Sequence, residues 1–383
     1  MTFSYHPRVI TAAAGVCQHD DDVAAAAHGA VASAIDALGR APHTVVVFSS
    51  ARYQDPRPVV AAARKAARGA RVVGCAAQGV IAGAREHEDE TAAACLALGG
   101  DDGVSPFLTV EPASLARDPG ERGLGLLFAD GYSHHPDDLA DALGSALPGY
   151  QLAGGLASGP RGLYPAHRWL DGDVSSAGTA GLLLAGVEPT VAVTTGLRAL
   201  GPVHRVTAGR GQVIATLDGR PAFEVFAERA RPLLDDLPRA AQSVFVAVAE
   251  TGDEGDPIEE HYGIRGLLRF DPERGLLAVS EAVPVGTRIR FAMRESHAAR
   301  EDLMRTIAAV AQTCRAPRFG FYFCCAGRGR NLFGVDDHDI AYIHAHLGAF
   351  PLVGFFGGGE IGPGRPGRPA RMHLFSGVLA LVP

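Results

Sequence analysis

The stretch PLVGFFGGGEIG, residues 351–362, contains the pattern on which the whole chain is built. It begins as a short apolar run and ends in a glycine-rich bend around a single acid, Glu360. The apolar run RFGFYFCCAGRG (318–329) and a helical segment (337–348) precede it, and LFSGVLALV (374–382) follows. Short apolar runs bounded by glycine indicate buried strands. The sequence therefore predicts the order strand, helix, strand, hairpin, strand.

The same order occurs twice more, nearer the N-terminus. The first copy contains VVVFSS (45–50), RVVGCAAQGVI (71–81) and TAAACLALGG (91–100), and the second contains GLGLLFADG (123–131), YQLAGGLASG (150–159) and GTAGLLLAG (178–186). In each copy two glycines stand five residues apart: Gly74 and Gly79, Gly154 and Gly159, Gly354 and Gly359. Glycine after a strand permits a positive φ and a close backbone approach, as a hairpin needs. Turn geometry is the favoured interpretation of these glycines, and ligand contact is the alternative.

From this repeated unit we predict an α/β fold of the α+β kind, with two related domains of mixed β-sheets flanked by helices. A length of 383 residues is large for one core and also favours two domains. Residues 190–317, between the second and third copies, alternate apolar and polar residues and predict further strands and helices. We place the domain boundary within this segment, between residues 1–225 and 226–383.

Composition restricts the kind of protein and the partners we expect. Hydrophobic residues make up 47% and charged residues 20%, which is typical of a globular protein. The net charge of −7 disfavours nucleic acid as a partner, and no apolar run reaches the length of a membrane span. The N-terminus shows no signal peptide, and the six cysteines form no CxxC pair. We therefore expect a cytoplasmic protein without a membrane or nucleic-acid partner.

Several stretches together resemble the FIST proteins, which carry paired N- and C-terminal FIST domains. They include CAGRGRNLFG (325–334), GFFGGGEIGP (354–363) and TTGLRALGPVHRVT (194–207). The resemblance implies that residues 1–225 form a FIST N-terminal domain and residues 226–383 a FIST C-terminal domain. It further implies a sensory protein of signal transduction that binds a small ligand, with amino acids proposed for the family, and that signals to a separate protein. The last strand departs from the family pattern, because HLFSGVLAL (373–381) stands where relatives resemble LHGFTASLAL.

Arg328 and Arg330 are the first candidate ligand-binding residues. They lie beside a glycine-flanked bend, where guanidinium groups and outward backbone N–H groups would suit a carboxylate or phosphate. Asn331 follows in the same motif and joins the predicted ligand set. The alternative is that both arginines pair with acids of the chain and hold the loop. For that role Asp336, Asp337 and Glu360 are available.

Glu360 is the second candidate, because the corresponding position in the other copies is Val80 or Pro160. If strand ends of the third copy meet, Glu360 and Arg328 would face one pocket and match the two ends of an amino acid. Gly357, Gly358 and Gly359 would let the backbone approach the ligand, and Phe355 or Phe356 would form an apolar wall. The alternative is an internal salt bridge that binds nothing.

Three other kinds of site are weaker. Cys325, at a strand end before glycine, is a weak candidate nucleophile, so an enzyme using Cys325 and Glu360 stays an alternative, although we expect no catalysis. A haem-binding gas or redox sensor is another alternative, but no CxxCH site is present and we predict no cofactor. The spacing of histidines and cysteines predicts no metal site. The acidic runs HDDD (19–22) and EHEDE (86–90) predict helix starts or solvated loops.

Overall fold

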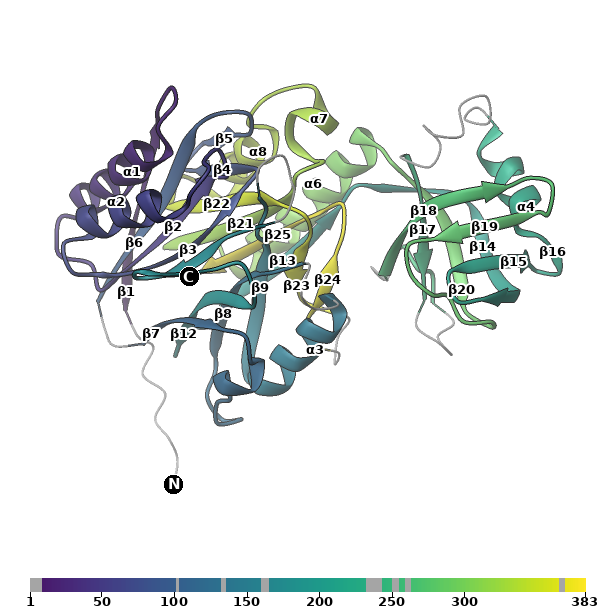
Figure 1. The fold of residues 1–383 in the computed structure, drawn as a ribbon, viewed down its shortest axis with the longest axis horizontal. Helices are drawn as coiled ribbons and strands as arrows, with labels where there is room; N and C mark the ends of the chain where they lie inside the picture. The colour runs from purple at the N-terminus through teal and green to yellow at the C-terminus, as the bar shows by residue number, and fades with distance from the viewer. Residues whose placement is uncertain are drawn as a thin grey trace. The chain divides into compact units, whose positions relative to one another are not determined.

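The computed structural model describes residues 9–100, 103–131, 136–159, 165–231, 243–249, 255–258, 263–364 and 369–383 (Figure 1). It confirms the predicted mixed α/β fold, with several mixed sheets flanked by helices. By packing, the chain divides into two compact units. Unit 1 contains Met1–Thr194 and Leu303–Pro383, and unit 2 contains Thr195–Asp302. The boundary expected at residues 225 and 226 therefore falls inside unit 2. None of the described helices is long and apolar enough to cross a membrane.

Unit 1 consists of the three copies. The first comprises β1 (Ile10–Gln18), α1 (Val23–Leu38), β2 (Thr44–Ser50), α2 (Arg57–Ala67), β3 (Arg71–Ala77), β4 (Gly79–Ala82), β5 (Arg85–His87) and β6 (Ala92–Gly100). The second comprises β7 (Val104–Thr109), η1 (Pro112–Leu115), β8 (Gly123–Ala129), α3 (Pro136–Ala146), β9 (Tyr150–Leu156), β10 (Arg168–Leu170), β11 (Asp173–Ser175) and β12 (Thr179–Ala185). The third comprises β13 (Thr190–Thr195), α6 (Ser296–Thr313), β21 (Phe319–Cys325), α7 (Gly329–Phe333), α8 (His338–Leu347), β22 (Leu352–Gly357), β23 (Glu360–Gly362), β24 (Arg371–His373) and β25 (Ser376–Val382).

Each copy forms four strands of its own sheet in the same order. The orders are β1-β6-β2-β3, β7-β12-β8-β9 and β13-β25-β21-β22. In each sheet the central pair is parallel, as in β2 with β3, and the remaining pairs within the first copy are antiparallel. Helices α1 and α2 pack side by side on one face of the first sheet (Figure 1).

The hairpin of each copy leaves its own sheet and completes the sheet of another copy. β4 pairs with β22, β10 pairs with β3, and β23 pairs with β9. The first copy thus adds its hairpin to the third, the second to the first, and the third to the second. This cyclic exchange gives each of the three sheets six strands.

Gly74, Gly154 and Gly354 occupy the same place in the second strand of their copies. At each of them the backbone of the neighbouring strand comes too close to leave room for a side chain. Each lies opposite the residue before a buried phenylalanine, in the pairs Val47 with Gly74, Leu127 with Gly154, and Tyr322 with Gly354. A Cβ would come within 1.8, 1.9 and 1.7 Å of the carbonyl oxygens of Val47, Leu127 and Tyr322. None of the three glycines has a positive φ. The predicted close approach is therefore confirmed for them, and the predicted positive φ is wrong.

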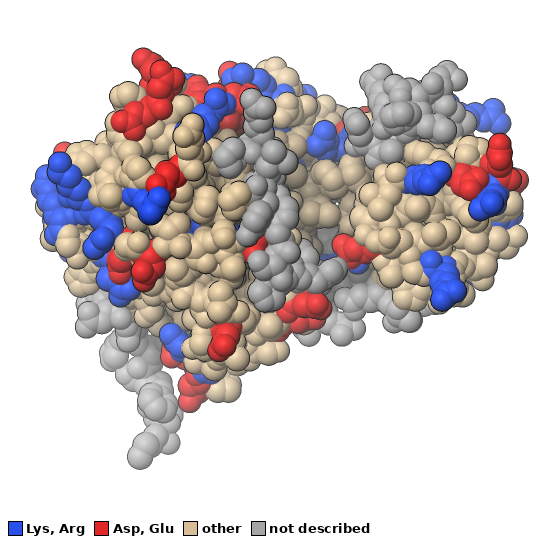
Figure 2. Space-filling model, viewed as in Figure 1, with Lys and Arg blue, Asp and Glu red and all other residues tan. Residues whose placement is uncertain are grey.

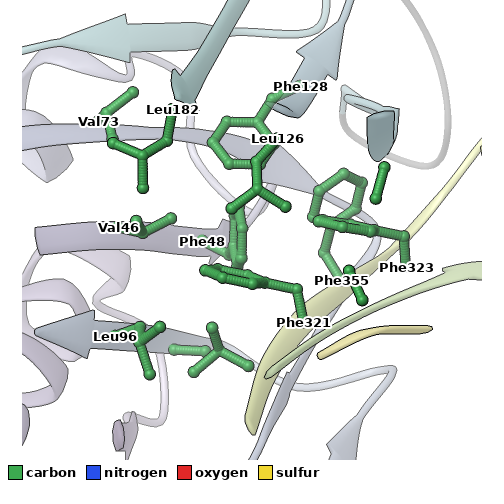
Figure 3. Close-up of a cluster of buried hydrophobic side chains, with 14 of the residues drawn as sticks. Val46, Phe48, Val73, Leu96, Leu126, Phe128, Leu182, Phe321, Phe323 and Phe355 are labelled. Atoms are coloured by element: carbon green, nitrogen blue, oxygen red, sulfur yellow. The ribbon is translucent and has the colours of Figure 1, made fainter. Parts of the chain in front are cut away.

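The three sheets enclose an aromatic centre between them. Phe48, Phe128 and Phe323 come from the first strands of the three copies, and their ring centroids lie 5.0 to 6.3 Å apart (Figure 3). Phe355 joins them at 5.0 Å from Phe48 and 5.2 Å from Phe323. The second copy has Gly155 at the equivalent position, where a Cβ would lie 3.1 Å from the Phe355 ring. The Phe355 ring thus fills space at the centre that the smaller equivalents, Cys75 and Gly155, leave open.

Unit 2 is a closed antiparallel barrel with a helix packed on it. Its elements are β14 (Leu197–Arg210), β15 (Val213–Leu217), β16 (Arg220–Pro221), α4 (Ala222–Arg229), β17 (Val244–Val248), β18 (Gly263–Asp271), β19 (Leu276–Val279) and β20 (Arg288–Arg294). The strand order β14-β20-β17-β18-β19-β15 closes because β15 also pairs with β14. Val225 and Phe226 of α4 are buried in its core. In sequence, unit 2 is an insertion between β13 and α6, where the first copy passes directly from β1 to α1.

Candidate functional site

Arg328 is buried and paired with an acid of α8. Its side chain is 1% exposed, and its Nε donates to Oδ2 of Asp339 at 2.5 Å. The same oxygen accepts the Tyr322 hydroxyl at 2.7 Å, and His338 Nδ1 lies 2.9 Å from Oδ1. Burial alone would raise the pKa of Asp339, but the Arg328 charge and these hydrogen bonds lower it to about 2. The chain itself therefore neutralises the guanidinium that we expected to receive a ligand anion, through an acid outside the predicted partners.

Arg330 and the bend before it are also engaged by the chain. The Arg330 side chain is 57% exposed, and its Nε donates to Asp336 Oδ1 at 2.5 Å, which is the predicted alternative. Its backbone N–H donates to Oε1 of Glu88 at 2.7 Å. Gly329 has φ +54, and a Cβ there would lie 2.5 Å from the same oxygen. A carboxylate of the first copy therefore occupies the bend where we expected a ligand.

Glu360 is fully buried and bonded to Ser376. Its Oε2 accepts the Ser376 hydroxyl at 2.6 Å and the Ser376 backbone N–H at 3.3 Å. Burial raises the pKa of Glu360 to about 8, although the Ser376 hydrogen bonds and the Arg328 charge oppose the shift. Among the described residues no ion pair joins Glu360 to Arg328. The structure thus brings the two predicted residues within electrostatic range but not into contact.

The strand register corrects the position equivalent to Glu360 in the second copy. Ile361, Trp169 and Ile81 pair with the three equivalent glycines Gly154, Gly74 and Gly354. The residues before them are Glu360, Arg168 and Val80, so the second-copy equivalent is the buried Arg168. Pro160, the expected equivalent, lies outside the described residues. The connection from β9 to β10 is longer than that from β3 to β4, which shifts the hairpin along the sequence.

The other predicted residues lie at and beyond the end of β22 and at the end of β21, where Cys325 pairs with Gly357. Phe355 is in the aromatic centre, fully buried. Gly357 ends β22, where a Cβ would lie 2.5 Å from the Leu156 carbonyl oxygen, whereas Gly358 faces open space. Gly359 lies against Met372, whose Sδ would be 2.9 Å from a Cβ. Cys325 ends β21 and is 8% exposed.

A cavity of about 790 Å³ lies in unit 1, at the carboxyl ends of the parallel strands β2 and β3. The lining comes from the start of α1, the β2–α2 connection, the segment after β3, the segment after β5, and the third copy. Its residues are Asp21, Asp22, Val23, Ala24, Ala51, Arg52, Tyr53, Gln54, Asp55, Pro58, Val59, Ala77, Gln78, Gly79, Glu88, Asp89, Ala326, Asn331 and Phe356. Of the ligand-binding residues predicted from the sequence, Asn331 and the alternative wall residue Phe356 are among them. Open α/β sheets commonly bind ligands beyond the carboxyl ends of their strands.

The charge of the lining is predominantly negative. Five of its residues are acids and one is a cation, namely Asp21, Asp22, Asp55, Glu88 and Asp89 against Arg52. Figure 2 shows acidic side chains (red) gathered along the upper edge of unit 1, near the loop before α1 and near β5. Arg52 Nη2 lies 3.9 Å from Asp89 Oδ1, so this exposed pair is loose. The cavity therefore suits a ligand with an ammonium group and offers one guanidinium to a carboxylate.

Sequence reasoning missed this cavity because four of its five acids come from two runs interpreted as helix starts or solvated loops. That interpretation is partly right, since Asp22 caps α1 by accepting the N–H groups of Ala24 and Ala25. The usable signal was two acidic runs at strand ends, one directly after β1 and one that overlaps the end of β5. Only the exchange of the β4–β5 hairpin brings the second run to the third copy.

Comparisons with known proteins agree with the motifs. The FIST N domain family model matches residues 43–220, and the FIST C domain model matches residues 222–363. An uncharacterised protein of Mycobacterium tuberculosis is 33% identical over 377 residues, which cover 96% of this chain and 98% of the relative. An uncharacterised protein of Mycobacterium bovis is 33% identical over 378 residues, covering 96% and 97%.

Among solved structures, a cyanuric acid hydrolase from A. caulinodans matches with a TM-score of 0.26 and 12% identity, over 46% of this chain and 71% of that chain. A likeness of this size carries no argument about fold or activity. The two family models together span most of the sequence, from residue 43 to residue 363. The chain therefore belongs to the FIST family and contains both of its domains.

Proposed function

We propose that this protein is a sensory protein of signal transduction that binds a small ligand in the 790 Å³ cavity of unit 1. FIST domains are associated with small-ligand-binding sensory and signalling roles, which supports the proposal. The location of the cavity at the carboxyl ends of β2 and β3 supports it independently. A separate signalling protein would receive the signal. All six cysteines are free thiols, which is consistent with a reducing cytoplasm.

The proposed ligand is an amino acid or another small zwitterion with an exposed ammonium group. The observation that carries this choice is the lining itself, in which five carboxylates and one guanidinium surround one hollow. An ammonium group would be attracted to the acids, and Arg52 would receive the carboxylate. Tyr53 and Phe356 supply apolar surface for the remainder of the ligand. A purely anionic ligand would meet repulsion from most of the lining.

Thermal unfolding with a panel of amino acids, simple amines and simple carboxylates tests the proposal. A ligand that binds only the folded protein raises its Tm by mass action. We expect ammonium-bearing compounds to raise the Tm of the wild type, and Asp55→Asn to weaken the response. Arg68→Ala, an exposed change outside the cavity lining, is the matched control and should respond like the wild type. The proposal fails if only simple carboxylates stabilise the protein, or if no compound does.

A further inference from the structure

We infer that Glu88 is both the receptor for the ligand's ammonium group and the clamp that holds α7, so that an occupied cavity tightens α7. The inference rests on the proposed function and adds a mechanism by which occupancy changes the protein. Glu88 suits this role because its side chain contacts both the cavity and the start of α7. It lines the cavity, and it accepts the first hydrogen bond at the start of α7.

The carboxylate of Glu88 lies close to both Gly329 and the backbone nitrogen of Arg330. Oε1 lies 2.7 Å from the Arg330 backbone nitrogen. Both carboxylate oxygens and the carbon between them would lie 2.5 to 2.6 Å from a Cβ at Gly329. Glycine is favoured there, since a side chain would displace the Glu88 carboxylate and the φ of +54 is strained for other residues. The fit indicates that Gly329 and Glu88 are matched to each other.

Helix α7 has little else to hold its first turn. It contains five residues, and helices this short do not form without tertiary support. Its N-cap residue, Arg328, makes no capping hydrogen bond with its side chain, which is bonded to Asp339 instead. Glu88 therefore supplies from another segment the acceptor that an N-cap residue usually provides.

The second carboxylate oxygen of Glu88 is the atom through which a ligand would act. Burial raises the pKa of Glu88, while the hydrogen bond from the Arg330 N–H and the Arg330 charge oppose this shift. The Arg330 guanidinium itself is bonded to Asp336. Across the described ranges no second hydrogen bond reaches the Glu88 carboxylate, so Oε2 remains available to a donor. An ammonium group bonded to Oε2 would restrain the carboxylate in the orientation in which Oε1 accepts the Arg330 N–H.

A tighter α7 would affect the buried pair behind it. Phe333, at the end of α7, stacks on the His338 ring with centroids 3.6 Å apart, and His338 in turn contacts Asp339. Asn331 of the same helix lines the cavity. Ligand occupancy would thus reach the start of α8 through a continuous set of contacts.

Hydrogen exchange at residues 329–334 tests the clamp without any ligand. We expect Glu88→Ala to speed exchange of the Arg330 amide about tenfold, because a charge-assisted bond is lost. Asp89→Ala is the matched control, since Asp89 lines the cavity but has no hydrogen bond to α7 among the described residues, and its Arg330 amide should exchange like that of the wild type. Glu88→Gln keeps an oxygen acceptor and should show a smaller increase, which covers the case in which Glu88→Ala does not fold. Wild-type exchange in both Glu88 variants would overturn the inference.

The second arm uses three four-carbon probes, n-butylamine, 4-aminobutyrate and butyrate. We expect the two amines to slow exchange of the Arg330 amide in the wild type and to have no such effect in Glu88→Gln. Asp55→Asn should bind them less tightly and yet keep wild-type exchange when no probe is present. Calorimetric binding of an amine without slower α7 exchange would contradict the inference and leave the proposed function standing. Absence of binding, with fast exchange in Glu88→Ala, would instead refute the proposed function and the receptor role of Glu88.

Discussion

Ser376 donates its hydroxyl to the fully buried carboxyl of Glu360, with 2.6 Å between Oγ and Oε2. Both residues belong to the third copy, on β25 and β23, and both are completely enclosed. By strand register, the residues equivalent to Ser376 in the first and second copies are Ala92 and Gly178. The acid on the hairpin and the hydroxyl on the last strand both differ from their equivalents in the other copies, and they form a hydrogen bond with each other.

Removing this hydroxyl should destabilise the protein. We expect Ser376→Ala to lower the free energy of unfolding by about 1–3 kcal/mol, because a buried oxygen loses its donor. Denaturant unfolding measures the change. Thr306→Ala, which removes a hydroxyl with a long 3.5 Å hydrogen bond on α6, should cost less and serves as the comparison. Equal effects would show that the Glu360–Ser376 bond contributes little.

The raised pKa of Glu360 predicts a specific dependence of stability on pH. The pKa is about 8 in the folded protein against an ordinary value of 4.5, so the folded state holds a proton that the unfolded state releases. This contribution to stability is fully present below pH 4.5 and is lost as the pH rises toward 8. Glu86, whose pKa burial also raises to about 8, adds a decline of the same sign.

Glu360→Gln tests this assignment, because the amide has no proton to lose. We expect the variant to lose less stability than the wild type between pH 5 and pH 8, measured as the midpoint of denaturant unfolding at each pH. A residual decline in Glu360→Gln should weaken further in a double variant that includes Glu86→Gln. Parallel curves for the wild type and both variants would show that neither group titrates in this range.

Removing one partner of the buried pair Arg328 and Asp339 should lower the free energy of unfolding more than replacing both partners by apolar residues. We expect Asp339→Asn to destabilise the protein by about 3–5 kcal/mol, because it leaves a buried guanidinium without a counter-charge. Replacing both partners, as in Arg328→Met with Asp339→Leu, should cost less than the sum of the single changes. A double-mutant cycle measures the coupling. Additive effects would contradict a direct pair.

Gly354→Ala should disrupt the third sheet. A Cβ there would lie 1.7 Å from the Tyr322 carbonyl oxygen, so the strands β21 and β22 would have to separate. We expect a loss of at least about 1–3 kcal/mol, as for other overpacked sites. Gly358→Ala is the matched control four residues away, because its Cβ would face open space. If both variants are equally stable, close approach is not what selects glycine at 354.

The repeated unit was predictable because its signals are local. An apolar run such as VVVFSS and the glycine at 74 identify a strand and its neighbour without knowledge of the remainder of the chain. The exchange of hairpins was not predictable, since pairing of β4 with β22 depends on contacts between distant segments. The same limit explains why the position of Phe355 was not predicted. An aromatic residue beside glycines suits the wall of a pocket, but Phe355 lies in the aromatic centre between the three sheets.

The candidate site shows the same division between local and distant signals. Arg328 and Glu360 were identified as unusual charges, and the structure does give them buried, electrostatically linked positions. Their partners, Asp339 and Ser376, could not be chosen from among many acids and hydroxyls by spacing alone. The cavity was missed because Asp21 and Glu88 come together only when the β4–β5 hairpin has joined the sheet of the third copy.

The cyclic exchange of hairpins also bears on synthesis by the ribosome. The segment β4–β5 emerges early, but β22, the strand that receives it, is translated only after unit 2 and α8. Until then the nascent chain carries strand edges that nothing covers, a condition that favours aggregation. The N-terminal and C-terminal FIST domains are therefore stretches of sequence that do not coincide with separate sheets, since the second and third sheets become complete only when the last copy has been made.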